Sequence, residues 1–335
     1  MISAARLRRS LVLVGIAAAV VLPARLSAFD QDQAALAAIT GILVISVVLL
    51  SGYVGQISFC QFSFAAIGAF TTGALVDGHG WNFWLAMPVG VVAAAGVGVL
   101  VGIPALRLTG LLLAVLTVAV ALFFDNFVLA TNTWPAFSGG STQWHPHKPS
   151  LLGQQLTGEY SFYLFTLVVL LLVVALVWNL RTGKVGRVLR AVRDSELAAG
   201  TMGLNVTAWK LAAFGLSAAI AGLAGCLIAV ANESVSAGSF DFLHSVQIIA
   251  IATVWGVGSL AAAGLGGIFF VYGPELLSKT PLSAKWFPLL VGAALVVQLV
   301  YTPEGIVAKT QADIAHLLHR RTRVPVADTS MVEAA

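Results

Sequence analysis

Long, unbroken runs of apolar residues make up most of this chain, and short polar or basic segments separate them. The runs are rich in Leu, Val and Ala and do not alternate with polar residues as half-buried strands do, so they predict helices. A membrane-spanning helix needs roughly 20 mostly apolar residues, and on this basis we expect about ten spans. They are Leu11–Ala28, Gln33–Leu50, Ile57–Val76, Phe83–Leu106, Leu108–Ala130, Tyr160–Leu180, Trp209–Ala231, Phe242–Val257, Leu260–Leu277 and Trp286–Tyr301.

Composition leads to the same fold class. Hydrophobic residues make up 59% of the 335 residues and charged residues only 10%, whereas about 25% of the residues of a soluble domain are charged. Lipid must therefore be part of the solvent, and in lipid every backbone polar group has to be paired internally, by helices or closed barrels. We predict an all-α, polytopic helical membrane protein, with a transmembrane domain over residues 1–307 and a basic, disordered cytoplasmic tail over residues 308–335.

The distribution of cations indicates the orientation. If the N-terminus is cytoplasmic and ten spans follow, 14 of the 18 Lys and Arg residues lie on the cytoplasmic side. They are Arg6, Arg8, Arg9, Arg107, Arg181, Lys184, Arg187, Arg190, Arg193, Lys210, Lys309, Arg320, Arg321 and Arg323, and the outer side holds Arg25, Lys148, Lys279 and Lys285. Such an excess of inner cations is typical of membrane proteins, so both termini are expected in the cytoplasm and no nucleic-acid partner is expected. The basic N-terminal head before an apolar run also resembles a signal peptide, but with so many spans following we interpret it as a retained first span.

The sequence gives only weak signals for a metal or redox site. The long outer connection, residues 131–159, contains His145 and His147 without a neighbouring cysteine or carboxylate, so we interpret both as solvated. Cys60 and Cys226 lie inside apolar runs and suit packing better than a disulfide or metal site. No phosphate-binding glycine loop is present. The sequence predicts no catalytic residue, no metal and no cofactor.

A basic segment interrupts the apolar runs at residues 181–207, and we refer to it as the basic loop. Its cations recur at every third position, at Arg181, Lys184, Arg187, Arg190 and Arg193. The apolar residues between them predict a short amphipathic helix over Gly186–Ala199, with supporting ion pairs between Arg190 and Asp194 and between Arg193 and Glu196. Gly200 and Gly203 are expected to end this helix, and Asn205 or Thr207 to cap the next span.

Several motifs in order resemble the LivM-type permeases of ATP-binding cassette (ABC) transporters for branched-chain amino acids. The run GKVGRVLRAVRDSELAAGTMGLNVTAWKLAAFGLSAAIAGLAGCLIA carries the strongest likeness. Further matching segments are Ser51–Leu75, Gly102–Ala121, Ser138–Ser141, Ser239–Val246, Val254–Gly267 and Tyr301–Val307. The resemblance covers Gln33–Val307.

The resemblance implies a permease subunit of the bacterial inner membrane that itself hydrolyses nothing. ATP-binding subunits inside, a second, similar permease and an extracytoplasmic solute-binding protein would be its partners, with branched-chain or other amino acids or related small polar solutes as cargo. The segment from 186 to 203 would couple the permease to the ATPase. The residues that carry this coupling role by resemblance are Arg187, Arg190, Arg193, Glu196, Ala198, Ala199 and Gly203.

Polar side chains within the spans are candidates for a solute path, because they tend to face the interior of a bundle. They are Gln56, Ser58, Gln61, Ser63, Asn126 and Gln247, with Asp125 and Gln298 as further members. Gly52 and Gly55 could break the helix just before them and expose backbone amides to a cavity. The alternative is that these side chains only hydrogen-bond between helices. Phe59, Phe62 and Trp255 are bulkier than the residues usual in the family and would narrow the path.

Two other functional classes remain open at this level. A secondary transporter driven by an ion gradient needs a buried carboxylate, for which Asp125 is the candidate. A membrane-embedded enzyme needs a constellation such as Ser/His or His/Asp, whereas His244 stands alone near the end of a span.

Overall fold

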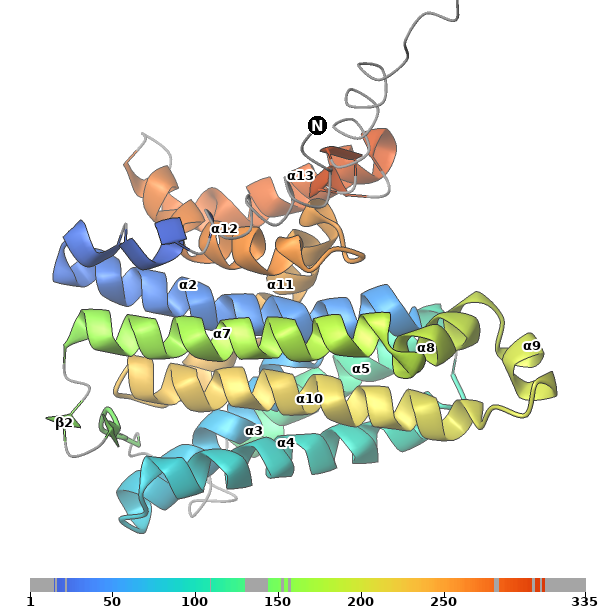
Figure 1. The fold of residues 1–335 in the computed structure, drawn as a ribbon, viewed down its shortest axis with the longest axis horizontal. Helices are drawn as coiled ribbons and strands as arrows, with labels where there is room; N and C mark the ends of the chain where they lie inside the picture. Colours follow the sequence, from blue (N-terminus) through green and yellow to red (C-terminus); the bar gives the residue numbers. More distant parts are fainter. Residues whose placement is uncertain are drawn as a thin grey trace, which may run out of the picture.

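The computed structural model describes residues 15, 17–21, 23–108, 110–129, 144–151, 154–155, 158–279, 283–302, 305–307 and 309–310. Within these ranges the chain is almost entirely helical (Figure 1), which confirms the all-α prediction. The α-helices are α2 (Ala28–Val47), α3 (Gln61–Gly73), α4 (Phe83–Ala105), α5 (Leu111–Phe123), α7 (Glu159–Thr182), α8 (Lys184–Asp194), α9 (Glu196–Thr201), α10 (Val206–Ala231), α11 (Phe242–Trp255), α12 (Ala261–Ser278) and α13 (Phe287–Tyr301).

Several helices continue or begin with turns of different pitch. Wider π-helical turns extend α2, α3 and α5 over Val48–Val54, Ala74–Gly78 and Phe124–Leu129. Short 3₁₀ turns cover Pro23–Arg25, Ala237–Phe240 and Ala284–Trp286. A two-residue antiparallel pair, β1 (Ser150–Leu151) with β2 (Gln154–Gln155), lies in the outer connection.

Six of the described helices are long and apolar enough to cross a membrane. They are Ala28–Val54, Phe83–Ala105, Leu111–Leu129, Glu159–Thr182, Val206–Ala231 and Ala261–Ser278. The predicted count of about ten spans is not confirmed. The first predicted span, Leu11–Ala28, lies partly outside the described residues, as do most of the outer connection and nearly all of the tail after residue 307.

The other predicted spans are helices too short to meet the same length criterion. The third predicted span starts as a helix only at Gln61, four residues later than expected, because residues 55–60 are not helical. The helix α11 has 14 residues and α13 has 15. We refer to residues 55–60 as the break.

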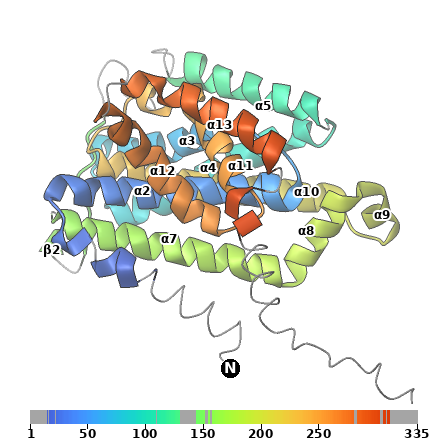
Figure 2. The ribbon, with the colours of Figure 1, turned by 90° about the horizontal axis from the view of Figure 1, so that it is seen from above.

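The helix α10 lies at the centre of the bundle and packs against α4, α3 and α2, and α2 also packs against α7 and α12. Figure 2 shows α5 and α7 at opposite edges of this arrangement. Small residues allow the close approaches: a Cβ on Gly68 would lie 2.1 Å from the carbonyl oxygen of Gly222, and one on Gly267 would lie 2.2 Å from that of Ala37. Such contacts are typical of helix association in membranes.

Side-chain caps fix where several helices begin. Ser27 accepts a hydrogen bond from the Asp30 amide at the start of α2, and Asn82 caps α4. Asn205 accepts from the Ala208 amide and caps α10, as predicted. Each cap satisfies a donor that the first turn of a helix leaves free.

Candidate functional site

The basic loop forms two helices rather than the single helix that its pattern predicts. After α8, Ser195 adopts an extended conformation with φ −160° and ψ 112°, and its Oγ accepts a hydrogen bond from the Ala198 amide 3.2 Å away. Ser195 therefore caps a second helix, α9, of six residues. The periodicity of apolar residues continues across this corner, which is why the sequence pattern does not reveal it.

The helix α8 lies against one end of the bundle through its apolar face. Leu189 is buried in a small cluster with Leu50 and Val54 at the end of the α2 segment and with Phe214 of α10. Val192 is also buried, whereas the cations Arg187 and Arg190 are exposed. Burial on one face and charge on the other make α8 a surface helix.

The end of α9 is a glycine turn. Gly203 has φ +80°, a left-handed conformation that favours glycine. The Gly203 amide bonds the Gly200 carbonyl at 3.0 Å and the Leu204 amide bonds the Ala199 carbonyl at 3.2 Å, which closes the helix in the manner of a C-terminal cap. Ala199 is fully buried under this turn.

The two predicted ion pairs within the basic loop are wrong. Glu196 instead pairs with Lys210 of α10, with 2.5 Å between Oε1 and Nζ. The Nε of Arg190 donates to the Gly186 carbonyl of its own helix at 3.0 Å. Ser195 turns the chain between Arg193 and Glu196, so their sequence spacing of three no longer places them on one helical face.

The tip of the basic loop exposes apolar and small side chains. Leu197 is 84% exposed and Met202 67% exposed, and Ala198 and Gly200 beside them are exposed as well. In Figure 1, α9 projects beyond the end of the helical bundle. This tip therefore offers an apolar, small-residue surface outside the bundle, on a loop that is otherwise charged.

The break interrupts the transmembrane region where the glycines predicted it. The π-helical segment Val48–Val54 ends at Gly55, which has φ +76°. Hydroxyl groups from other helices then hold the break and the first turn of α3. Thr117 of α5 accepts from the Phe59 amide in the break at 3.1 Å, and Ser245 of α11 accepts from the Phe62 amide in α3 at 3.1 Å. Non-helical backbone at membrane depth is tolerated when protein surrounds it or when it lines a cavity.

Gln61 lies in a closed, buried hydrogen-bond network. Its Oε1 accepts from the Ser46 hydroxyl at 2.9 Å, and its Nε2 donates to the Ser217 Oγ at 3.3 Å. The Ser217 hydroxyl in turn donates to the Ser46 carbonyl at 2.8 Å. The three residues tie α2, α3 and α10 together, so at Gln61 the interhelical contact that we considered as the alternative is present.

The remaining path candidates fall into two groups. Gln56, Ser58 and Ser63 are buried in or beside the break, and the Oε1 of Gln56 is buried without a hydrogen-bond partner in the described structure. Gln247 is half-buried on α11. Asn126 is exposed, and its Nδ2 bonds the Leu122 carbonyl of its own helix at 3.0 Å, away from the others.

Other residues also take part in this region. Thr117 bonds the break, and Ser46, Ser217 and Ser245 bond the first residues of α3 that follow it; single hydroxyls in apolar spans were the only sequence signal for these four residues. Cys60 and Cys226 are fully buried free thiols, and the Cys60 thiol donates to the Thr117 carbonyl at 3.0 Å.

Two of the three aromatic residues that were expected to narrow the path, Phe62 and Trp255, pack against neighbouring rings. The Phe62 ring lies 5.4 Å from the His244 ring and 6.1 Å from that of Phe270, and the Trp255 ring lies 6.2 Å from that of Phe269.

Charged contacts at the opposite end of the bundle fasten the outer connection. The buried Lys148 Nζ lies 2.9 Å from the Glu159 carboxylate and 3.9 Å from that of Glu233. His145 is exposed, as predicted, but its amide also donates to Asp77 and its ring contacts the Glu233 carbonyl at 3.1 Å. Asp125 accepts from the Phe242 amide at 3.0 Å and thereby supports the start of α11. Among the described residues no group of three or more His, Cys, Asp or Glu side chains gathers for a metal ion.

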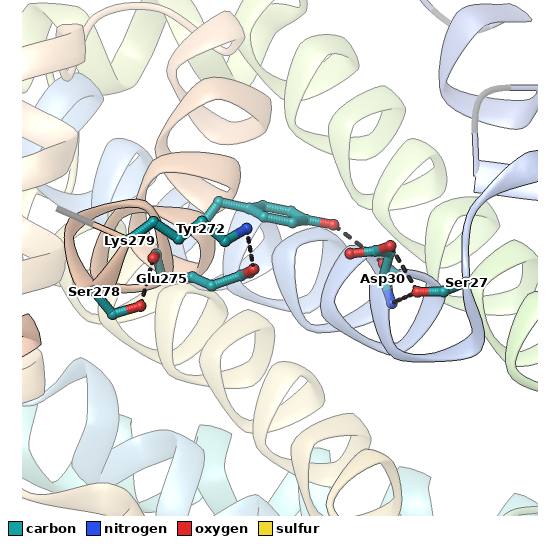
Figure 3. A network of polar contacts seen from close by, with 6 residues as sticks. All are labelled: Ser27, Asp30, Tyr272, Glu275, Ser278 and Lys279. Carbon is teal, nitrogen blue, oxygen red and sulfur yellow. Dashed lines mark hydrogen bonds and ion pairs between the residues drawn. The ribbon is translucent and has the colours of Figure 1, made fainter.

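A groove of about 500 Å³ opens between α2, α12 and α13 at the same end. Figure 3 shows the polar network along it. The Tyr272 hydroxyl donates to the Asp30 carbonyl at 3.1 Å, and Lys279 bonds Glu275 at 2.8 Å, a contact that raises the pKa of the lysine. The Tyr272 contact joins α12 to the start of α2, whereas the Lys279 contact lies within the end of α12.

An apolar helical bundle with six membrane-length helices among the described residues, an interrupted span and an exposed elbow formed by α8 and α9 defines a polytopic membrane protein. Residues 32–299 match the family of the branched-chain amino acid transport system permease component. This match covers most of the chain, so the chain belongs to that family. With its membrane-length helices, the chain is a permease subunit of an ABC importer in the bacterial inner membrane, and such a subunit is not an enzyme.

Individual relatives support the same family. The high-affinity branched-chain amino acid transport system permease protein LivM of Escherichia coli is 29% identical over 319 residues, covering 88% of this chain and 74% of that protein. The corresponding LivH protein is 23% identical over 294 residues, 81% of this chain and 92% of LivH. The fructose import permease protein FrcC of Rhizobium meliloti is 29% identical over 154 residues, 43% of this chain and 42% of FrcC. No solved structure matches the chain.

Proposed function

We propose that this chain forms half of a translocation pathway for branched-chain amino acids and that the segment from 186 to 203 couples it to an ATP-binding subunit. The exposed elbow of α8 and α9 is the observation that carries the coupling role. Leu197 and Met202 project from it into solvent, although both are apolar. A protein partner that covers these side chains would recover the hydrophobic free energy lost by their exposure.

Three further kinds of subunit complete the proposed assembly. Two ATP-binding subunits act on the cytoplasmic face, and a solute-binding protein delivers ligand at the face that carries Lys148. A second permease of similar type pairs with this chain. The helix α5 supports that pairing because it lies at the edge of the bundle and exposes Leu111, Leu112, Val115 and Phe123.

We place the solute path beside the break. The side-chain oxygen Oε1 of Gln56 is buried without a hydrogen-bond partner among the described residues, and Ser58 and Ser63 lie near Gln56 in the chain. Such groups suit the polar ends of an amino acid, while the surrounding Phe and Val side chains suit an apolar side chain. Gln61 would instead keep the helices in register, and Asn126 lies outside the path.

The proposal of alternating access follows from these parts. Closure of the ATP-binding subunits on nucleotide would displace the elbow and favour one orientation of the path over the other, because their contacts differ between the two states. An ion-gradient mechanism receives no comparable support, since the Asp125 carboxylate already accepts a hydrogen bond from the backbone of α11.

Substitution at the tip tests the coupling role. Leu197→Asp removes an apolar side chain that is 84% exposed, so the permease should fold normally yet lose recovery of the ATP-binding subunit in a pull-down and lose ATP-driven uptake of leucine in proteoliposomes. Arg107→Ala, an exposed cation in the turn after α4, is the control. Full ATP-coupled uptake by Leu197→Asp would refute the coupling role.

The solute is tested separately. The cognate solute-binding protein should bind leucine, isoleucine or valine in calorimetry, and the complete complex should take up the same amino acids. Binding of a sugar or an amide in their place would refute the proposed cargo and leave the coupling role intact.

A further inference from the structure

Arg193 makes a direct polar contact between the basic loop and the segment that precedes the break. Its Nη1 donates to the Gly52 carbonyl, with 2.5 Å between nitrogen and oxygen. Its Cγ lies 3.0 Å from the place that a Cβ on Gly55 would occupy. The guanidinium group therefore binds one glycine while the aliphatic stem lies against the other.

The acceptor lies in the last turn of a helix, where carbonyl groups need donors from outside the helix. The amides of Gly55 and Gln56 both turn back to the Leu50 carbonyl, so neither serves Gly52. A cation is also favoured at this end by the partial negative charge of the helix C-terminus. Arg193 thus supplies both a hydrogen-bond donor and a positive charge to the turn that leads into the break.

The Cα of Gly52 faces the turn between α11 and α12. A Cβ on Gly52 would lie 1.9 Å from the Val257 carbonyl oxygen, so no side chain fits there. Gly256, next in this turn, has φ +107°. The Gly52 peptide is therefore held between Arg193 of the basic loop and the loop before α12, at the junction of three elements.

We propose that Arg193 transmits movement of α8 and α9 to the break, and so positions Gln56 and Ser58 in the path. This inference rests on the proposed coupling function. When the elbow moves, the Arg193 guanidinium leaves the Gly52 carbonyl, the last turn before Gly55 loses its donor and cation, and residues 55–60 change their packing. Leu189 packs with Leu50 and Val54 and would also carry movement of α8 to the end of the α2 segment. Its apolar side chain cannot replace the hydrogen bond that Arg193 donates to Gly52.

Two simpler roles would leave Arg193 outside this transmission. As a surface cation it could bind the ATP-binding subunit directly, in which case its removal would impair assembly. As a purely structural cap it could stabilise the permease, in which case its removal would lower the melting temperature without changing the uptake obtained for each ATP hydrolysed.

The ratio of solute uptake to ATP hydrolysis distinguishes these roles in the complete complex in proteoliposomes. In Arg193→Ala we expect this ratio to fall by about tenfold or more, the effect of losing a hydrogen bond to a charged group. The ratio is measured only on complexes that retain the ATP-binding subunit, so a loss of assembly is scored separately from a loss of transmission. Arg193→Lys keeps one donor and the charge, and should restore part of the ratio, while Arg107→Ala should behave as wild type.

A labelling measurement follows the break itself. Ile57 is 49% exposed within the break, whereas the native Cys60 and Cys226 are fully buried. In Ile57→Cys we expect the rate of maleimide labelling to change when the ATPase is trapped with vanadate, and we expect Arg193→Ala to abolish that change.

The possible outcomes are separable. An unaltered uptake ratio together with nucleotide-dependent labelling in Arg193→Ala would overturn the inference, and so would loss of the ATP-binding subunit from that variant. If the wild-type chain recovers no ATP-binding subunit, the proposed coupling function fails first and this inference fails with it.

Discussion

At the scale of single residues, glycines, which have no side chain, determine how closely α10 approaches α3. A Cβ on Gly225 would lie 1.8 Å from the Ala65 carbonyl oxygen, and one on Gly222 would lie 2.3 Å from the Ala94 Cβ of α4. Neither contact can be relieved by rotating a side chain, because Cβ is fixed to the backbone. These glycines therefore set the distance between the central helices.

We expect Gly225→Ala to destabilise the permease by about 1–3 kcal/mol, since overpacking forces backbone shifts. The measurement is the melting temperature of the purified chain in detergent. Gly96→Ala is the matched control, because Gly96 is a helical glycine of α4 with no atom within 4 Å of an added Cβ. There alanine should be neutral or stabilising by up to about 1 kcal/mol. Equal melting temperatures for the two variants would contradict this account of the interface.

The polar residues near the break could be located from sequence, but their partners could not. Gln56, Ser58 and Gln61 are conspicuous in an apolar run, and Gly52 and Gly55 marked the interruption. Whether Gln61 faces a cavity or another helix depends on Ser46 and Ser217, which are far away along the chain. Helical periodicity gives no such pairing between helices, so the two interpretations were open until the bundle was assembled.

At the scale of elements, conformation departs from the sequence pattern where one residue changes the direction of the chain. Residues 57–60 are apolar enough to be counted with the third predicted span, yet Gly55 ends the preceding helix with a positive φ and the next helix starts only at Gln61. Ser195 likewise divides the predicted amphipathic helix by capping α9. The hydrophobic pattern predicts where the helices lie, whereas the corners depend on backbone conformations that the pattern does not encode.

The attachment of α9 to α10 depends on an ion pair with one buried partner. The Lys210 side chain is 4% exposed and the Glu196 side chain 49% exposed. In Glu196→Gln the ammonium group stays buried without its partner, and we expect a cost between the value of about 1 kcal/mol for exposed pairs and the 3–5 kcal/mol for buried ones. Hydrogen exchange of the amides of residues 196–201 should accelerate accordingly.

A charge swap separates the pair from other effects of the substitution. The double variant Glu196→Lys with Lys210→Glu should recover much of the protection that either single variant loses, because the pair is restored in reverse. Asp194→Asn is the control, since this exposed residue forms no ion pair among the described residues. Exchange rates in Glu196→Gln equal to those in Asp194→Asn would show that the pair contributes nothing to α9.

At the scale of the whole molecule, the described cations separate by end of the bundle. The basic loop lies beside Leu50 and Val54 at the end of the α2 segment, while Lys279 and Tyr272 lie near Asp30 at its start (Figure 3). The arrangement supports the expected asymmetry of charge. Because positive segments tend to remain in the cytoplasm, we predict that the end with the basic loop faces the inside.

A single-cysteine labelling experiment tests that assignment and the status of the short helix α11. With a membrane-impermeant maleimide on intact spheroplasts, we expect Lys279→Cys to react and Lys184→Cys to react only in inverted vesicles; both positions are exposed, and the native thiols are buried. After α10 reaches the end of the bundle that carries Glu233, the chain must cross back to the basic-loop end before α12 can run to the end that carries Tyr272. The helix α11 lies on this return, but its 14 residues span only about 21 Å of a hydrocarbon core of about 30 Å. The turn Ala237–Phe240 and adjoining extended residues must therefore cover the remaining depth. If both cysteines react from the same side, residues 234–259 do not cross the membrane, and a count of spans that includes α11 is wrong.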